Sequence, residues 1–210
     1  MCAYMDMKRL YNVVIVAVVA LIAAFALSCN NDSDAVLTKQ QNDISRYLTS
    51  SHQPKLVEES EVLYPEDKTP FYTRWDLDIY RYIATYYDEG RDEQPEVTSD
   101  STIDIFYRAY VFTGSAPSLS SLFATNDAET IAELEQLGLN TEYEWSTEAL
   151  SVRMGKGDLF SGLETALEGC RKGDSVEVYL TYNKAYGKHY VGLVPAKSSL
   201  VWYIDIVDVK

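Results

Sequence analysis

The chain is poor in histidine and in basic residues, and each shortage excludes a class of function. Its two histidines, His52 and His189, cannot build a His-rich metal site. It has 18 Lys and Arg against 32 Asp and Glu, a formal net charge of -14, which argues against nucleic-acid binding because phosphate contacts need a basic surface. The sequence also lacks a Gly-rich phosphate loop and a nucleophile-elbow serine. We therefore expect no metal, no cofactor and no nucleic-acid partner.

Long apolar runs are also scarce, and the clearest one extends from Val13 to Leu27. It is shorter than the roughly 20 apolar residues that a transmembrane helix needs. It follows the basic pair Lys8 and Arg9, and this order is typical of a secretory signal peptide. An uncleaved signal anchor is the alternative.

The exit of this run, Ala26-Leu27-Ser28-Cys29, resembles the bacterial lipobox, in which the cysteine is diacylated and cleavage occurs just before it. The resemblance predicts a signal peptide over residues 1–28 and lipidation of Cys29. Asp32 and Asp34, which follow, resemble the surface-export signals of Bacteroidetes-type lipoproteins. We expect a protein exported to the cell envelope and anchored in the outer membrane, on its periplasmic or surface face.

Cysteine is nearly absent from the expected mature chain. The sequence has three cysteines: Cys2 would leave with the leader and Cys29 would be modified, so Cys170 alone remains and no internal disulfide can form. Cys170 ends a helical apolar stripe, which favours a packed core thiol over a nucleophile.

The remaining sequence changes character near residue 76. Residues 29–76 are polar and contain Pro54, Pro65 and Pro70, which predicts a tether with one short helix around Ile44 and Leu48. Residues 77–210 show patterns of strands and helices and are expected to form the folded domain.

Alternating apolar residues predict most of the strands of this domain. An N-cap at Asn126-Asp127 begins one helical pattern, which Gly138 ends, and Asp158 is expected to cap a second, amphipathic helix. These elements predict an α+β fold with an antiparallel sheet packed on a short helix. The expected strands are 79–87, 102–112, 150–154, 176–181 and 200–209.

The segment from Leu150 to Lys210 resembles an FKBP-type peptidyl-prolyl cis-trans isomerase domain in the order and spacing of its motifs. No single motif is specific, but the ordered series extends over about sixty residues. Upstream, Tyr107 and Phe123 match the family more weakly. The series comprises Gly155, Gly162-Leu163, Leu167, Cys170, Gly173, the strand 176–181, Ala185-Tyr186-Gly187, Val194-Pro195 and the terminal strand from Ser199 to Ile204.

The resemblance implies an antiparallel sheet wrapped on a short amphipathic helix, with an apolar pocket that receives a proline ring. It implies proline-containing polypeptides as substrates and a role as a folding factor for exported proteins. By this resemblance the catalytic positions are Tyr107, Phe123, Tyr186 and Trp202, and the substrate pocket adds Leu150, Leu159, Phe160, Leu163 and Val194.

The sequence departs from the family pattern at several of these positions. Ala124 stands where the family has a pocket aspartate, and Leu163 stands where it has a tryptophan floor. Arg108-Ala109 and Thr181-Tyr182 also differ, and a helical segment, residues 127–147, is inserted. These departures predict weak isomerase activity, or a binding or chaperone module without turnover. An unrelated solute- or glycan-binding surface lipoprotein is a third alternative.

Overall fold

Two long strands, β4 (Thr102–Phe112) and β8 (Ser199–Val209), form the centre of the sheet. In the computed structural model, which describes residues 32–139 and 142–210, they pair antiparallel from Ile103↔Val209 to Phe112↔Ser199. The apolar alternation predicted for both strands is confirmed, because Ile103, Ile105, Trp202 and Ile206 all lie in one core cluster.

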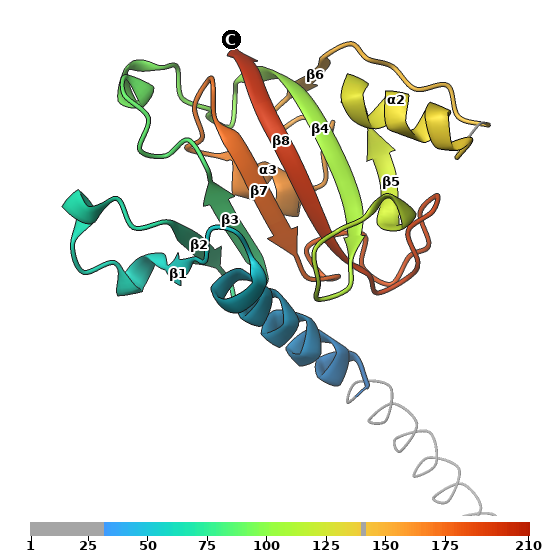
Figure 1. Cartoon of the computed structure of the whole chain (residues 1–210), viewed down its shortest axis with the longest axis horizontal. Coiled ribbons are helices and arrows are strands. Elements are labelled where there is room, and N and C mark those ends of the chain that lie inside the picture. Colours follow the sequence, from blue (N-terminus) through green and yellow to red (C-terminus); the bar gives the residue numbers. More distant parts are fainter. Residues whose placement is uncertain (1–31, 140–141) are drawn as a thin grey trace, which may run out of the picture. The chain divides into compact units, whose positions relative to one another are not determined.

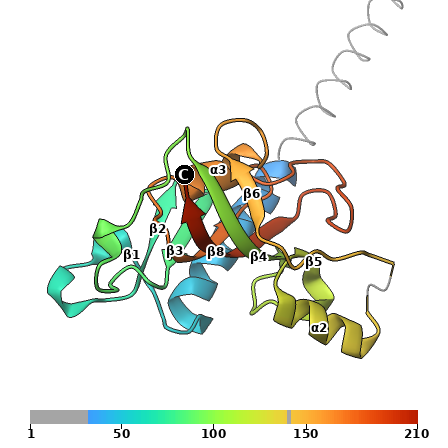
Figure 2. The same ribbon diagram turned by 90° about the horizontal axis from the view of Figure 1, so that it is seen from above.

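The other strands extend this pair into one eight-stranded sheet within the described residues. The order is β1-β2-β3-β7-β8-β4-β5, and β6 also pairs with β4 (Figures 1 and 2). Only the pairing of β1 with β2 is parallel among these strands. The α+β fold with a multistranded sheet and few helices is confirmed. The remaining strands are β1 (Val57–Glu58), β2 (Phe71–Trp75), β3 (Ile79–Ile83), β5 (Leu122–Thr125), β6 (Leu150–Arg153) and β7 (Ser175–Leu180).

The helix α3 (Ser161–Leu167) supplies the main apolar stripe that faces this sheet. Its Leu163, Ala166 and Leu167 are fully buried in the same cluster as the β4 and β8 residues. Cys170, just after the helix, is fully buried as well, and burial raises the pKa of its thiol to about 11. The thiol therefore stays protonated and packs as a core residue, as the sequence predicts.

The two helix caps have different outcomes. The helix α2 (Ala128–Leu137) begins as expected, because the Asp127 side chain accepts a hydrogen bond from the Thr130 backbone N–H and Gly138 ends the helix in the left-handed region. The predicted Asp158 cap is wrong. The N-cap of α3 is Phe160, and the Asp158 carboxylate instead accepts two hydrogen bonds from the Arg153 guanidinium, both at 3.0 Å.

The opposite face of the sheet carries a second core, which the sequence analysis did not anticipate. Residues 40–46 are helical and continue into a π-helical turn, η1 (Tyr47–Ser51). Ile44, Tyr47 and Leu48 are buried there with sheet residues that include Tyr80 and Tyr179. The tyrosines cover this face because each has an apolar ring and a polar end.

Because of this second core, the folded unit begins earlier in the chain than the sequence predicts. The chain divides into Met1–Lys39 and a compact unit that begins at Gln40, not at Leu77. The segment expected to be a tether thus contributes β1, β2 and the 3-10 turns η2 (Glu59–Glu61) and η3 (Pro65–Asp67) to that unit. Two further 3-10 turns, η4 (Arg91–Glu93) and η5 (Leu119–Ser121), lie in later loops.

The buried side chain of His52 joins this N-terminal segment to β7. Its Nε2 lies 2.9 Å from the Glu177 carboxylate and its Nδ1 lies 2.5 Å from the Pro54 carbonyl oxygen. Both neighbours are acceptors, so only the doubly protonated ring can donate to both. Burial lowers the pKa of His52, but the Glu177 hydrogen bond, the Pro54 carbonyl and the Glu177 charge together raise it above 6.5.

Stability is therefore expected to depend on the protonation of His52. A raised folded-state pKa contributes stability that is fully present below pH 6.5, the ordinary value, and is lost as pH rises through the folded pKa. His52→Gln should remove this component of the pH dependence in urea unfolding, and His189→Gln, at an exposed position, is the matched control. Identical pH dependence in the wild type and His52→Gln would contradict the assignment.

The signal peptide and Cys29 lie outside the described residues. Within residues 32–139 and 142–210, no helix is long and apolar enough to cross a membrane. The same residues contain no His, Cys, Asp and Glu cluster arranged to hold a metal ion.

Candidate functional site

A groove of about 570 Å³ opens at the β5 side of the sheet, between the strands and the segment that enters α3. β4 and β8 place Tyr107 and Trp202 at its base, because both residues follow the inward alternation of their strands. β5 contributes Phe123 and Ala124, and residues 157–160 contribute Leu159 and Phe160. Leu150 of β6 also lines the groove but is 41% exposed.

Trp202 is the centre of an aromatic cluster that forms the walls. Its ring centroid lies 5.3 Å from that of Tyr107, 5.8 Å from Phe123 and 6.0 Å from Phe160. Tyr186 closes the cluster with edge contacts to Phe160 at 5.2 Å and to Phe123 at 6.4 Å. Such interlocked rings hold one another in place, so the groove is formed before any ligand binds.

Tyr186 is positioned by a close backbone contact between its loop and α3. A Cβ on Gly162 would stand 2.0 Å from the Lys184 carbonyl oxygen, so only glycine allows the loop to pack there. The loop is further held by hydrogen bonds from the Gly187 N–H to the Tyr182 carbonyl at 2.7 Å and from the Gln40 side chain to the Lys197 carbonyl at 2.8 Å.

The two tyrosine hydroxyls of the groove are neutral donors. Burial raises the pKa of both Tyr107 and Tyr186, and for Tyr186 the neighbouring Tyr107 raises it further. Within the described residues neither hydroxyl makes a hydrogen bond to another protein group, so each is free to donate to a ligand carbonyl.

The groove offers no free carboxylate. Ala124 lines it where a carboxylate would be expected from the family pattern, and Asp158 is the only acidic side chain among the lining residues of the described chain. The Arg153 side chain and its backbone N–H hold the pKa of Asp158 down at about 2. Asp158 is therefore ionised and already paired.

Two predicted pocket residues lie elsewhere. Leu163 is fully buried and Val194 is 2% exposed, and both belong to the core beneath the groove instead of lining it. The groove is lined instead by Val191 and Leu193 of the loop after Tyr186, which the sequence analysis did not select. The exposed apolar run from Tyr190 to Leu193, in a loop of polar residues, is the sequence signal that could have identified them.

Comparison with protein families finds a match for the C-terminal part of the chain. Residues 132–207 match the family model described as FKBP-type peptidyl-prolyl cis-trans isomerase. This range includes Leu159, Phe160, Tyr186 and Trp202 of the groove, whereas Tyr107 and Phe123 precede it. No curated protein matches the chain. Residues 132–207 thus form an FKBP-type segment, which supports peptidyl-prolyl isomerase activity in general.

Proposed function

We propose that the groove binds a proline residue of a polypeptide and accelerates cis-trans isomerisation of the preceding peptide bond, as a folding factor for exported proteins. The observation that carries this proposal is the preformed cluster of five rings, Tyr107, Phe123, Phe160, Tyr186 and Trp202. The last three of these rings lie in the segment that matches the isomerase family.

The chemistry requires no acid, base or nucleophile. Resonance opposes rotation of the Xaa-Pro bond with a barrier of about 20 kcal/mol, and twisting the bond removes this resonance. An apolar groove that grips the proline ring favours the twisted form, because it separates the imide from water. The neutral hydroxyls of Tyr107 and Tyr186 can orient a neighbouring carbonyl oxygen.

The residues of the groove also favour a low rate of isomerisation. With Ala124 and Leu163 in place of the family's aspartate and tryptophan, the groove has neither a free carboxylate nor an aromatic floor from α3. Trp202 supplies an aromatic base from β8 instead. The alternative of a binding or chaperone module without turnover rests on these same departures.

Isomerase activity is testable by NMR exchange on short Xaa-Pro peptides. The folded wild-type protein should accelerate exchange, with a preference for an apolar residue before proline. Tyr186→Phe removes one hydroxyl donor and should reduce the rate by roughly two- to tenfold, as expected for one lost hydrogen bond. Tyr64→Phe, at a 60% exposed position that does not line the groove, is the matched control. If the folded wild type accelerates no peptide, the binding-module alternative replaces the catalytic proposal.

We propose further that the protein is exported to the cell envelope and anchored through acylated Cys29. The support is the sequence alone, in which a basic start, an apolar run and Leu27-Ser28-Cys29 occur in order. Two acyl chains would give a stable anchor, since each buried methylene contributes about 0.8 kcal/mol.

Cys29→Ser should abolish lipid labelling in bacterial cells and leave an unprocessed precursor. Cys2→Ser, which changes a cysteine before the apolar run, is the control and should mature normally. Normal processing and membrane association of Cys29→Ser would overturn the proposed anchor.

A further inference from the structure

A second cavity, of about 640 Å³, lies at the β2–β3 side of the sheet and shares no lining residue with the proline groove. Its walls come from β2, from β3 and the loop that follows, and from the turn after α3. The strand β2 and the loop after β3 both precede the segment that matches the isomerase family. The cavity is therefore separate from the groove that we propose for the isomerase reaction.

Strand pairing explains why aromatic and basic side chains meet there. β2 and β3 are antiparallel with Thr73 opposite Arg81, so Phe71, Trp75 and Arg81 project from the same face of the sheet. The Phe71 ring lies 4.9 Å from the ring of Tyr86 and 6.3 Å from that of Tyr87. The cavity thus has an aromatic wall beside a guanidinium group.

Arg81 is a cation whose hydrogen bonds go to neutral groups in the part of the chain that the structure describes. Its Nη1 donates to the carbonyl oxygens of Ala166, at 2.9 Å, and Glu168, at 2.7 Å, and its guanidinium stacks 4.6 Å from the Trp75 ring. Its Nε is buried without a hydrogen-bond partner. Within the described residues no carboxylate lies within ion-pair distance of Arg81, and its Nη2 makes no hydrogen bond. Two carbonyls and a ring fix this guanidinium in place and leave Nη2 for a ligand.

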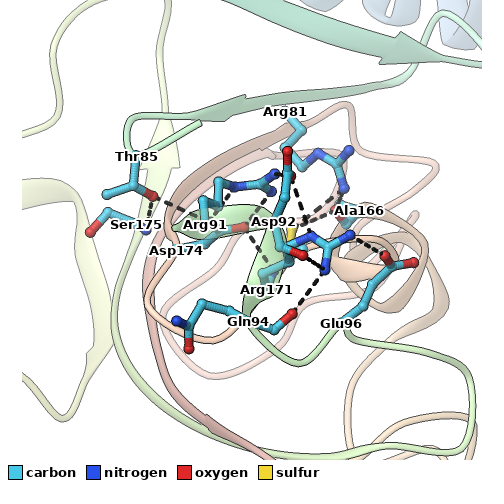
Figure 3. A network of polar contacts seen from close by, with 11 residues as sticks. Arg81, Thr85, Arg91, Asp92, Gln94, Glu96, Ala166, Arg171, Asp174 and Ser175 are labelled. Carbon is cyan, nitrogen blue, oxygen red and sulfur yellow. Dashed lines mark hydrogen bonds and ion pairs between the residues drawn. The ribbon is translucent and has the colours of Figure 1, made fainter. Parts of the chain in front are cut away.

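The neighbouring arginines hold the cavity wall in one arrangement (Figure 3). Arg91 forms a two-pronged ion pair with the buried Asp174, at 2.7 and 2.8 Å. Arg171 donates to the Gln94 carbonyl oxygen at 2.8 Å and pairs with Glu96 at 2.8 Å. The loop after β3 is thereby tied to the turn after α3, so the cavity does not have to be ordered by a ligand.

The residues that line the cavity include more basic than acidic side chains, but Arg91 and Arg171 are already paired with Asp174 and Glu96. Lys68, Arg81, Arg91 and Arg171 line it together with only two acidic residues, Glu59 and Asp92. The chain as a whole has a net charge of -14. Arg81, which donates only to carbonyl oxygens and has no carboxylate partner among the described residues, is therefore the group that can attract an anion, and a guanidinium is the side chain best suited to carboxylates.

We propose that this cavity binds an organic carboxylate, with the carboxylate on Nη2 of Arg81 and an apolar or aromatic body against Phe71, Trp75 and Tyr86. The site is independent of the proline groove. A carboxylate beside an aromatic group occurs both in free aryl acids and in the free C-terminus of a polypeptide that ends in an aromatic residue.

Calorimetric titration of the full chain with 3-phenylpropionate tests the site, and 3-phenylpropionamide is the uncharged control. The acid should bind and the amide should bind at least tenfold more weakly, because a charge-assisted hydrogen bond is lost. A peptide with a C-terminal Phe, as free acid and as amide, forms the second pair of probes. Tighter binding of the peptide acid than of 3-phenylpropionate identifies polypeptide ends as the source, and the reverse identifies small acids.

Variants locate the binding. Arg81→Gln should weaken 3-phenylpropionate binding at least tenfold, and Phe71→Ser should weaken it as well without touching the Arg81 hydrogen bonds. Arg46→Gln removes an equal charge at an exposed position and is the matched control. Thermal melting shows whether Arg81→Gln folds. If Arg81→Gln does not fold, binding of 3-phenylpropionate to Phe71→Ser tests whether the cavity is the binding site.

The proposal is overturned if the wild type fails to bind the acid, if it binds acid and amide equally, or if Phe71→Ser and a folded Arg81→Gln bind like Arg46→Gln. Isomerase activity of Phe71→Ser should equal that of the wild type, so failure of this site and failure of the proposed isomerase function are distinguishable.

Discussion

Trp202→Ala should destabilise the folded protein by about 3–5 kcal/mol, the usual cost of removing a large aromatic ring from a core, and should abolish isomerase activity. The ring is only 6% exposed and contacts Tyr107, Phe123 and Phe160. Its removal creates a cavity in the core and also deprives three groove walls of their common support. Urea unfolding and NMR exchange on an Xaa-Pro peptide measure the two effects.

Trp202→Phe separates these effects. The indole Nε1 of Trp202 is buried without a hydrogen-bond partner, and such a group costs about 1–3 kcal/mol. Phenylalanine removes that N–H while it keeps an aromatic ring at the base, so this variant should lose much less stability than Trp202→Ala and should retain activity. If Trp202→Ala is folded and isomerises peptides at the wild-type rate, the groove is not the site of the reaction.

The sequence predicted the central strands well because their alternation has a simple cause. β4, β7 and β8 each present one apolar face to α3, and residues such as Val176, Val178 and Ile204 are buried as the period of two requires. The other face was harder to interpret. Tyr179 and Tyr203 alternate with those residues in β7 and β8, and tyrosine is compatible with both a solvated face and a covered one.

The candidate site was predicted in part for a similar reason. The family resemblance selected Tyr107, Phe123, Phe160 and Trp202, and the inward alternation of β4 and β8 turns Tyr107 and Trp202 into the groove. The prediction that Leu163 and Val194 line the pocket depended on how deep each side chain lies. Tertiary packing sets that depth. To predict the Arg81 cavity, one would have to know that β2 pairs with β3. The β2 sequence Phe-Tyr-Thr-Arg-Trp has no apolar alternation that would predict this strand.

A chain that begins at Leu77 should fail to fold cooperatively, whereas a chain over residues 30–210 should unfold in one transition. The shorter chain lacks five side chains that are at most 6% exposed: Ile44, Tyr47, Leu48, Leu56 and Tyr72. At about 1.5–3 kcal/mol for each buried side chain, the loss is roughly 7–15 kcal/mol, as large as the whole stability of a typical domain. Near-UV circular dichroism and urea unfolding of both chains check this expectation.

The same deletion should also disturb the proline groove. Gln40 donates from its side chain to the Lys197 carbonyl oxygen at 2.8 Å and accepts from the Tyr182 N–H at 2.9 Å, so it fixes both ends of the loop that carries Tyr186. Leu48→Ala is the point variant for the full chain and should cost about 2–5 kcal/mol without touching that loop. If the chain from Leu77 unfolds at the same urea concentration as residues 30–210, residues 40–76 are a dispensable tether and the second core does not stabilise the domain.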